Sequence, residues 1–315
     1  MFAGLFTKAS PGAANDRESG ESCSLTSVLF PVAIGSMWLQ LYYSATPVWR
    51  NGEYYDYAWF VPPIAFFFFF QRWQERPKGE FDPQMSGWLL PLAMVLFLFL
   101  LAIRSLEGVD PTWRPPMLLH AGMVTLTTLF FLHLAGGKVL LCGMVPVIVF
   151  ALSAIPYPFQ FESALIETLS NWVVEISGAV FHLLGRPVLV SGGIIEYHGT
   201  KVEVTEGCSG IQSLQSLVMA SLYFGEFFRL RASGRVLLVA MGVVVAVTVN
   251  IGRAIFLAHL RFTRGEESFD ASHDGVGHVA FAVGGLCLLI VAKVLISRDW
   301  KKGVIRRRQT RLKSA

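Results

Sequence analysis

Eight apolar segments constrain the fold of this chain more than any other feature of its sequence. They lie at residues 26–45, 58–71, 87–103, 117–134, 139–156, 210–228, 236–260 and 276–297. A helix needs about 20 apolar residues to cross the hydrocarbon core of a bilayer, and most of these segments approach that length. With 53% hydrophobic and 15% charged residues, the composition excludes an ordinary soluble domain. The sequence therefore predicts an all-α polytopic membrane protein with about eight transmembrane helices.

Basic residues predict how these helices are oriented. They follow the second segment (Arg72, Arg76 and Lys78), the fourth (Lys138), the sixth (Arg229, Arg231 and Arg235) and the eighth (residues 298–315). Positively charged loops tend to stay on the cytoplasmic side of a membrane. We therefore expect a multi-pass protein of the cytoplasmic (inner) membrane with both termini in the cytoplasm.

This orientation divides the chain into three parts. Residues 1–25 are a polar cytoplasmic tail without the pattern of a cleaved signal peptide, and the first apolar segment is the expected uncleaved targeting signal. Residues 26–297 form the eight-span membrane domain, and residues 298–315 form a basic cytoplasmic tail.

The longest extracytoplasmic part of the membrane domain is residues 157–207. Its apolar spacing predicts a helix over 166–184 that lies on the membrane or packs against the bundle. Residues 188–190 and 201–205 predict two short strands of a β-hairpin-like unit. This unit leads directly into a cysteine motif.

Cys208 is the first candidate catalytic residue. It lies in the sequence Glu-Gly-Cys-Ser-Gly at 206–210, where Ser209 opens the sixth apolar segment and Gly210 allows close approach of a substrate. A helix that begins there directs N–H groups at the thiol, which lowers its pKa and can bind an oxyanion. The other cysteines offer no evident disulfide partner, so we expect a free thiol. The alternative is a small apolar filler at a span end.

Arg253 is the second candidate, because a guanidinium within the seventh apolar segment needs an explanation. A charge well inside the membrane costs about 2.5–3.5 kcal/mol or more, so such groups usually face a polar cavity. Asn250 lies one turn earlier on the same helical face, and we expect it to hold the guanidinium. The alternative is that Arg253 extends to the outer headgroups.

His273 is the third candidate, as a proton-transfer group at a predicted loop-to-helix junction. Histidine is suited to proton transfer near neutral pH, and Asp274 or Glu206 would orient the ring. The alternative is an exposed loop histidine beside a helix cap. His278 and His259 compete for the role, although the first lies inside a span and the second has the position of an interfacial residue.

Depth in the membrane brings the three candidates to one level. Cys208, Arg253 and His273 each lie roughly 27 to 31 Å along a helix from a basic residue at its cytoplasmic end. This length nearly matches a hydrocarbon core of about 30 Å. A thiol, a guanidinium and an imidazole at one membrane face are the working parts of a cysteine acyl-transfer enzyme.

A metal site is the competing interpretation of the same residues. Cys208, His259, His273 and His278 could surround zinc, but no His-Glu-x-x-His run is present, and His273 and His278 lie on different helical faces. We therefore expect neither a metal nor a cofactor. Nucleic acid is not an expected partner, because the positive charges gather at span ends.

Three ordered motifs resemble the exosortase and archaeosortase family of membrane transpeptidase-like enzymes. They are Glu-Gly-Cys-Ser-Gly at 206–210, Asn-Ile-Gly-Arg at 250–253 and His-Asp-Gly-Val-Gly at 273–277. The resemblance covers roughly residues 28–297. The stretch at 55–62 is also similar to a family pattern, but Tyr57 and Ala58 stand where that pattern has His and Gly, so no catalytic role is assigned there.

The resemblance implies a cysteine peptidase and transpeptidase with its active site on the extracytoplasmic face. Its substrates would be exported proteins whose C-terminal tail carries a short sorting motif, a transmembrane helix and a basic cluster, and an unknown acceptor would receive them. Cys208 would be the nucleophile, His273 the general acid and base, and Arg253 the group that stabilises the oxyanion or positions the substrate.

Two alternatives come from other functional classes. The first is a transporter or channel that uses Arg253 in an anion path. The second is a non-catalytic membrane component of surface polysaccharide export. Either would retain its function without the thiol of Cys208, whereas acyl transfer would stop.

Overall fold

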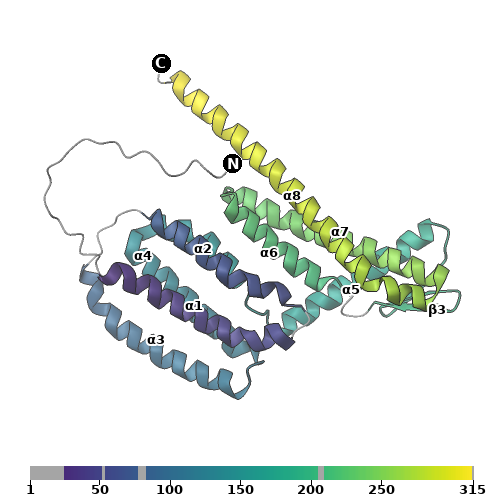
Figure 1. The fold of residues 1–315 in the computed structure, drawn as a ribbon, viewed down its shortest axis with the longest axis horizontal. Helices are drawn as coiled ribbons and strands as arrows, with labels where there is room; N and C mark the ends of the chain where they lie inside the picture. Colours follow the sequence, from purple (N-terminus) through teal and green to yellow (C-terminus); the bar gives the residue numbers. More distant parts are fainter. Residues whose placement is uncertain (1–24, 52–53, 77–82, 205–208, 314–315) are drawn as a thin grey trace.

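The computed structural model describes residues 25–51, 54–76, 83–204 and 209–313 of the chain (Figure 1). Its helices are α1 (Leu25–Asn51), the short 3₁₀ helix η1 (Asp56–Phe60), α2 (Val61–Gln74), α3 (Pro83–Val109), α4 (Arg114–Leu152), α5 (Phe159–Leu183), α6 (Ile211–Phe227), α7 (Ala232–Arg264) and α8 (Glu266–Lys313). Its strands are β1 (Leu189–Ser191), β2 (Ile194–Tyr197) and β3 (Thr200–Glu203). The chain is mostly helical, as predicted, and the small sheet lies between α5 and α6 in sequence.

Helix α4 is two antiparallel arms rather than one rod. Its backbone leaves helical geometry at Gly136 and Gly137, where Gly137 has a φ of 61°. Trp38 of α1 donates a hydrogen bond to Thr128 at 3.1 Å, and Tyr42, one turn later, donates to the carbonyl of Ala151 at 3.1 Å. In a straight helix, positions 128 and 151 would lie about 35 Å apart. The chain therefore reverses at the two glycines, between the predicted segments 117–134 and 139–156.

Three described helices are long and apolar enough to cross a membrane, judged by length and composition. They are Arg114–Leu152, Ala232–Arg264 and Glu266–Arg298. Each remaining apolar segment from the sequence also overlaps a helix, and η1 continues into α2. Apolar side chains remain on the outside of these helices, as Leu126, Val236 and Val279 illustrate, which fits a lipid environment better than water.

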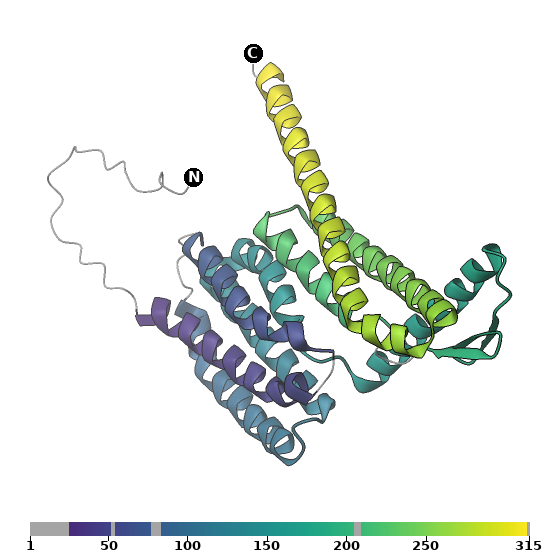
Figure 2. The ribbon, with the colours of Figure 1, turned by 45° about the vertical axis from the view of Figure 1, so that its right-hand side comes forward.

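Two hydrophobic cores hold most of the described helices together, and a third lies between α5, α7 and the sheet. The first joins α1, η1, α2 and both arms of α4, with Leu41, Phe68 and Phe150 fully buried. The second joins α6, α7 and α8 through Ile211, Leu238 and others. Figures 1 and 2 show α6, α7 and α8 side by side, with the end of α8 extending beyond the other helices. Side chains of α6 also pack on the first core, so this helix connects the two groups.

Polar contacts between helices define two ends of the molecule. At one end, Gln212 donates to the Asp56 carboxylate at 3.2 Å, which joins the starts of α6 and η1. At the other, Arg72 and Arg235 both form ion pairs with Glu226, which joins the ends of α2 and α6 to the start of α7. These are called the Gln212 end and the Glu226 end below.

The segment between α5 and α6 forms a three-stranded antiparallel sheet with the order β1-β2-β3. The sequence predicted two strands and missed β2, because Ile194–Tyr197 lacks the strict alternation of polar and apolar residues that residues 201–205 show. Glycines with positive φ make the tight turns at both ends of β2: Gly192 and Gly193 before it, and Gly199 after it. Val188, Ile195 and Val202 pack against α5 and α7, so this sheet rests on the helical bundle.

The connection from α7 to α8 differs from the prediction. The sequence put His273 at a loop-to-helix junction, but α7 continues to Arg264 and α8 begins at Glu266. Gly265 adopts a φ of 86° and allows the reversal within one residue. Glu266 in the first turn of α8 then pairs with Arg261 at 2.8 Å and suits the positive end of the helix dipole. His273 therefore lies inside α8.

Helices α6 and α7 approach closely at Gly242. A Cβ at this position would collide with the hydroxyl of Ser221, which is itself bonded to the Leu217 carbonyl at 2.7 Å. Without that hydroxyl, the nearest atoms of Leu217 and Ser221 would lie at 3.4 Å and 3.5 Å, which is ordinary contact. The small side chains on both helices thus set their separation.

We predict that Gly242→Ala destabilises the protein by about 1–3 kcal/mol because it overfills this contact. The double variant Ser221→Ala/Gly242→Ala should recover most of the loss, since the colliding hydroxyl is gone. Thermal unfolding in detergent micelles measures both. The control is Gly285→Ala on α8, where a Cβ meets nothing within 4 Å. Additive losses in the double variant would contradict this account of the packing.

Candidate active site

The end of the predicted cysteine motif is held by α7. Ser209 is only 1% exposed, and its carbonyl accepts a hydrogen bond from Nδ2 of Asn250 at 3.0 Å. Its hydroxyl accepts a second bond from the backbone N–H of Ile211 at 3.3 Å. A buried carbonyl needs such a partner. The chain that enters α6 is thus fixed against the middle of α7.

Gly210 is required at this entry for two reasons. It precedes the first residue of α6 with a φ of 84°, in the left-handed region that glycine adopts without strain. A Cβ here would also collide with the side chain of Asn250. The glycine of the motif therefore allows the contact between Asn250 and Ser209.

Arg253 and His273 meet between α7 and α8. The Arg253 Nη2 atom lies 3.1 Å from Nε2 of His273, and Nδ1 of the same ring lies 3.1 Å from a carboxylate oxygen of Asp274. A guanidinium can only donate, so Nε2 accepts and the ring proton is on Nδ1, where it is donated to Asp274. The contacts therefore assign a neutral His273 in the Nδ1–H tautomer.

The Arg253 guanidinium lies beside Gly277 of α8. A Cβ at Gly277 would lie 3.7 Å from its Nε atom, which is an ordinary contact distance. Nε itself is buried and has no hydrogen-bond partner among the described residues. Arg253 therefore contacts α8 through Nη2, and its Nε–H can still donate a hydrogen bond.

The predicted site residues form two contact groups on one face of α7. Ser209, Gly210 and Asn250 make up the first, and Arg253, His273 and Asp274 make up the second. Asn250 and Arg253 are three residues apart on α7, a rise of about 4.5 Å, so the groups are neighbours. Asn250, which was expected to hold Arg253, donates a hydrogen bond to the Ser209 carbonyl. Cys208 and Glu206 lie outside the described residues.

The sequence did not indicate a second polar cluster at the Gln212 end. The hydroxyl of Tyr55 donates to the buried carboxylate of Glu162, which also pairs with Arg114 at 2.8 Å. Burial and the neighbouring carboxylate raise the pKa of the Tyr55 hydroxyl, so it remains a donor. Together with the Gln212–Asp56 bond, this cluster ties the start of α5 and the start of α6 to η1. The partners in this cluster lie 48 to 156 residues apart in the sequence, so they leave no local sequence signal.

The other candidate histidines have different contacts. Nδ1 of His278 bonds the backbone carbonyl of Asp274 within α8 at 2.8 Å, and Nδ1 of His259 lies 2.8 Å from a guanidinium nitrogen of Arg186. Neither bond involves Arg253. Within the described part of the chain, no three His, Cys, Asp or Glu side chains are grouped so that they could hold a metal ion.

The fold and this cluster define a helical membrane protein with a polar site at one end of an apolar bundle. The sequence model of one family, described as transmembrane exosortase, matches residues 49–290, well over half of the chain. The protein belongs to the transmembrane exosortase family. The match includes Ser209, Asn250, Arg253 and His273, as well as the position of Cys208. Neither the curated proteins nor the solved structures contain a significant match.

We predict that Asn250→Ala lowers the stability of the protein by about 1–3 kcal/mol, because the buried carbonyl of Ser209 loses its donor. Thermal unfolding in detergent micelles measures the loss. Asn171→Ala on the exposed face of α5 is the matched control and should change little. Equal effects of the two substitutions would show that the bond to Ser209 carries no special weight.

Proposed function

We propose that this exosortase is an integral-membrane cysteine peptidase and transpeptidase that removes the C-terminal sorting tail of exported proteins and transfers them to a surface acceptor. The observation that carries the proposal is the Arg253–His273 contact beside the Asn250–Ser209 contact, because these bonds gather three parts of the chain at one place. Cys208 precedes Ser209 directly in the sequence. The family implies the class of activity, and the catalytic roles are assigned below to individual residues of this chain.

Arg253 would act on the carbonyl oxygen of the scissile peptide bond. Its Nη2 donor is used by His273 in the resting arrangement, and its buried Nε has no partner among the described residues. A substrate carbonyl that takes these donors would be polarised, and the tetrahedral oxyanion would gain more from them than the ground state does.

His273 would then move the proton. When Arg253 turns to the substrate carbonyl, Nε2 becomes able to accept the proton of the Cys208 thiol, while Nδ1–H stays bonded to Asp274. The thiolate attacks the carbonyl carbon, and the leaving amine takes the proton from Nε2. A thioester remains on Cys208, and a nucleophilic group of the acceptor attacks it and returns the thiol. Substrate binding and base activation are coupled in this scheme.

The membrane arrangement that we propose has eight crossings. The contacts of the Gln212 end and the Glu226 end are compatible with it, because α2 and α6 run from the first end to the second and α7 runs back. The reversal within α4 supplies the fourth and fifth crossings. Basic residues gather at the Glu226 end, so this end would face the cytoplasm and the site would face outward.

We predict that Cys208→Ala abolishes tail removal, because no thioester can form. Full-length exported proteins that retain the sorting tail should accumulate in the membrane, and mass spectrometry of mature C-termini in the parent strain should locate the cleaved bond. Unchanged removal of the tails in the variant would refute the mechanism and favour a transporter or a non-catalytic export component.

Matched controls separate chemistry from folding in this experiment. Cys142→Ala and Cys287→Ala remove the two free thiols that the structure describes and should leave cleavage intact. His273→Ala should lower the cleavage rate by about 10²-fold or more, the usual contribution of a general acid and base. His278→Ala removes a second imidazole from the same helix and should have little effect.

We predict opposite labelling of the two ends by a membrane-impermeant maleimide. Lys201→Cys on the exposed face of β3 should react in intact spheroplasts, whereas Arg231→Cys before α7 should react only after permeabilisation. Both are introduced into a variant without the natural cysteines. Labelling of both positions from the outside would overturn the proposed orientation.

A further inference from the structure

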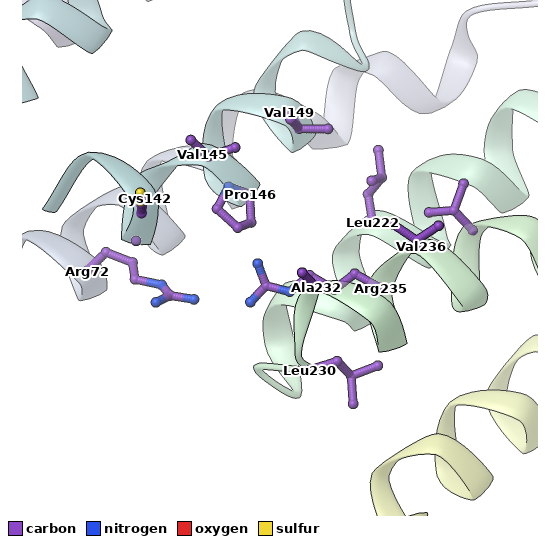
Figure 3. A pocket seen from close by; sticks show the side chains of 12 residues that line it. Arg72, Cys142, Val145, Pro146, Val149, Leu222, Leu230, Ala232, Arg235 and Val236 are labelled. Atoms are coloured by element: carbon purple, nitrogen blue, oxygen red, sulfur yellow. The ribbon is translucent and has the colours of Figure 1, made fainter. Parts of the chain in front are cut away.

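A cavity of about 580 Å³ lies at the Glu226 end, away from the candidate active site. Its lining comes from α2, the second arm of α4, α6, the α6–α7 connection and α7. Arg72 and Arg235 are the only charged residues in this lining, and Figure 3 shows their guanidinium groups facing one another from α2 and α7. Pro146, Leu222 and Val236 represent the apolar remainder. The cavity therefore combines a basic centre with apolar walls.

Among the described residues, the basic centre has one positive charge more than its carboxylate partner balances. Glu226 is buried, and its carboxylate pairs with Arg72 at 2.6 Å and with Arg235 at 3.0 Å. Two guanidinium groups thus share one carboxylate. The Nε atom of Arg235 is buried and has no hydrogen-bond partner among the described residues. A group with one negative charge and several acceptor oxygens would complete this arrangement.

The apolar walls indicate what else the bound group carries. Val145 and Val149 of α4 and Val236 of α7 line the cavity and are also exposed on the outside of the bundle, so the cavity opens between these helices. A free inorganic anion has no apolar surface that could pack against these side chains. A phosphate attached to acyl chains would place its head at the guanidinium groups and lead the chains out along the valines into the bilayer.

We propose that this cavity is a binding site for one anionic phospholipid of the membrane leaflet at the Glu226 end. The phosphate lies in the cavity against the guanidinium groups of Arg72 and Arg235, beside the Glu226 carboxylate that they share, and the acyl chains follow the exposed valines. The lipid balances the extra charge and joins α2, α4 and α7, which belong to the two different helix groups. This inference is independent of the peptidase mechanism, because it involves neither Cys208 nor the opposite end of the bundle.

The test uses the full chain in nanodiscs and native mass spectrometry of the lipids that remain bound. The wild-type protein should retain one phosphatidylglycerol in preference to phosphatidylcholine. Arg235→Gln should weaken this retention by about fivefold or more, the ratio that one lost cationic contact near a membrane surface produces. Glu226 keeps Arg72 as its partner in this variant, so no buried carboxylate is left unpaired.

Arg231→Gln is the matched control. It removes the same charge four residues earlier at the same end, but Arg231 is exposed and does not line the cavity. Its retention of phosphatidylglycerol should stay within about twofold of the wild type, since screening by salt weakens contacts between exposed charges. Arg235→Lys keeps the charge without the planar fork and should fall between the wild type and Arg235→Gln.

Three outcomes would overturn the proposal. One is equal retention of phosphatidylcholine and phosphatidylglycerol by the wild type, which would show a cavity filled by apolar contact alone. A second is equal loss in Arg231→Gln and Arg235→Gln, which would show attraction to the whole basic surface. The third is displacement of the lipid by millimolar inorganic phosphate, which would show a site for a free anion. The first and third need no variant, so the test stands even if Arg235→Gln fails to fold.

Discussion

The fold depends on the pairing of polar side chains within apolar helices. Glu107 of α3 is buried and contacts Ser44 of α1, His120 of α4 and Arg104 of its own helix. Removing one partner of a buried ion pair destabilises a protein by about 3–5 kcal/mol, because the other charge stays buried and unpaired. An apolar helix surface can pack against many other apolar helix surfaces with similar energy, whereas a buried carboxylate can be paired by only a few neighbouring side chains. Such clusters therefore fix which helices are neighbours and at what height.

The sequence predicted the helices well and the turns between them less well. Apolar length marks a helix because every residue contributes to it, and all eight apolar segments and the helix at 166–184 overlap helices. Turns depend on single residues. Gly136 and Gly137 reverse the chain within α4, as the gap between two apolar segments indicated. The end of α7 at Gly265 was not predicted. The polar residues that follow Gly265 have the composition of a loop, although they are helical. The strand β2 was missed because its residues do not alternate between polar and apolar side chains, whereas residues 201–205 do.

Counting residues along the helices predicted that Arg253 and His273 lie close together, but it could not predict the partners of the site residues. Nη2 of Arg253 lies 3.1 Å from Nε2 of His273. The partner of Asn250 is a backbone carbonyl, and every residue has one, so no sequence pattern could single out Ser209. Gly210 offered a clue, since a glycine directly before a helix often allows a close approach from a neighbouring one.

The two ends of the α6–α7 pair differ in how their charges are balanced. This difference fits the two kinds of anion that we propose, a transient one during catalysis and a permanently bound lipid phosphate. Among the described residues of the candidate site, Arg253 and Asp274 carry opposite charges and contact His273 from two sides. Negative charge would appear there only when a thiolate or an oxyanion forms, and Arg253 would then leave the ring. At the Glu226 end, two guanidinium groups share one carboxylate, and the excess charge is permanent. A transient anion would suit the proposed catalysis, because the site must release it, and a lasting one would suit the proposed structural lipid, because it need not leave.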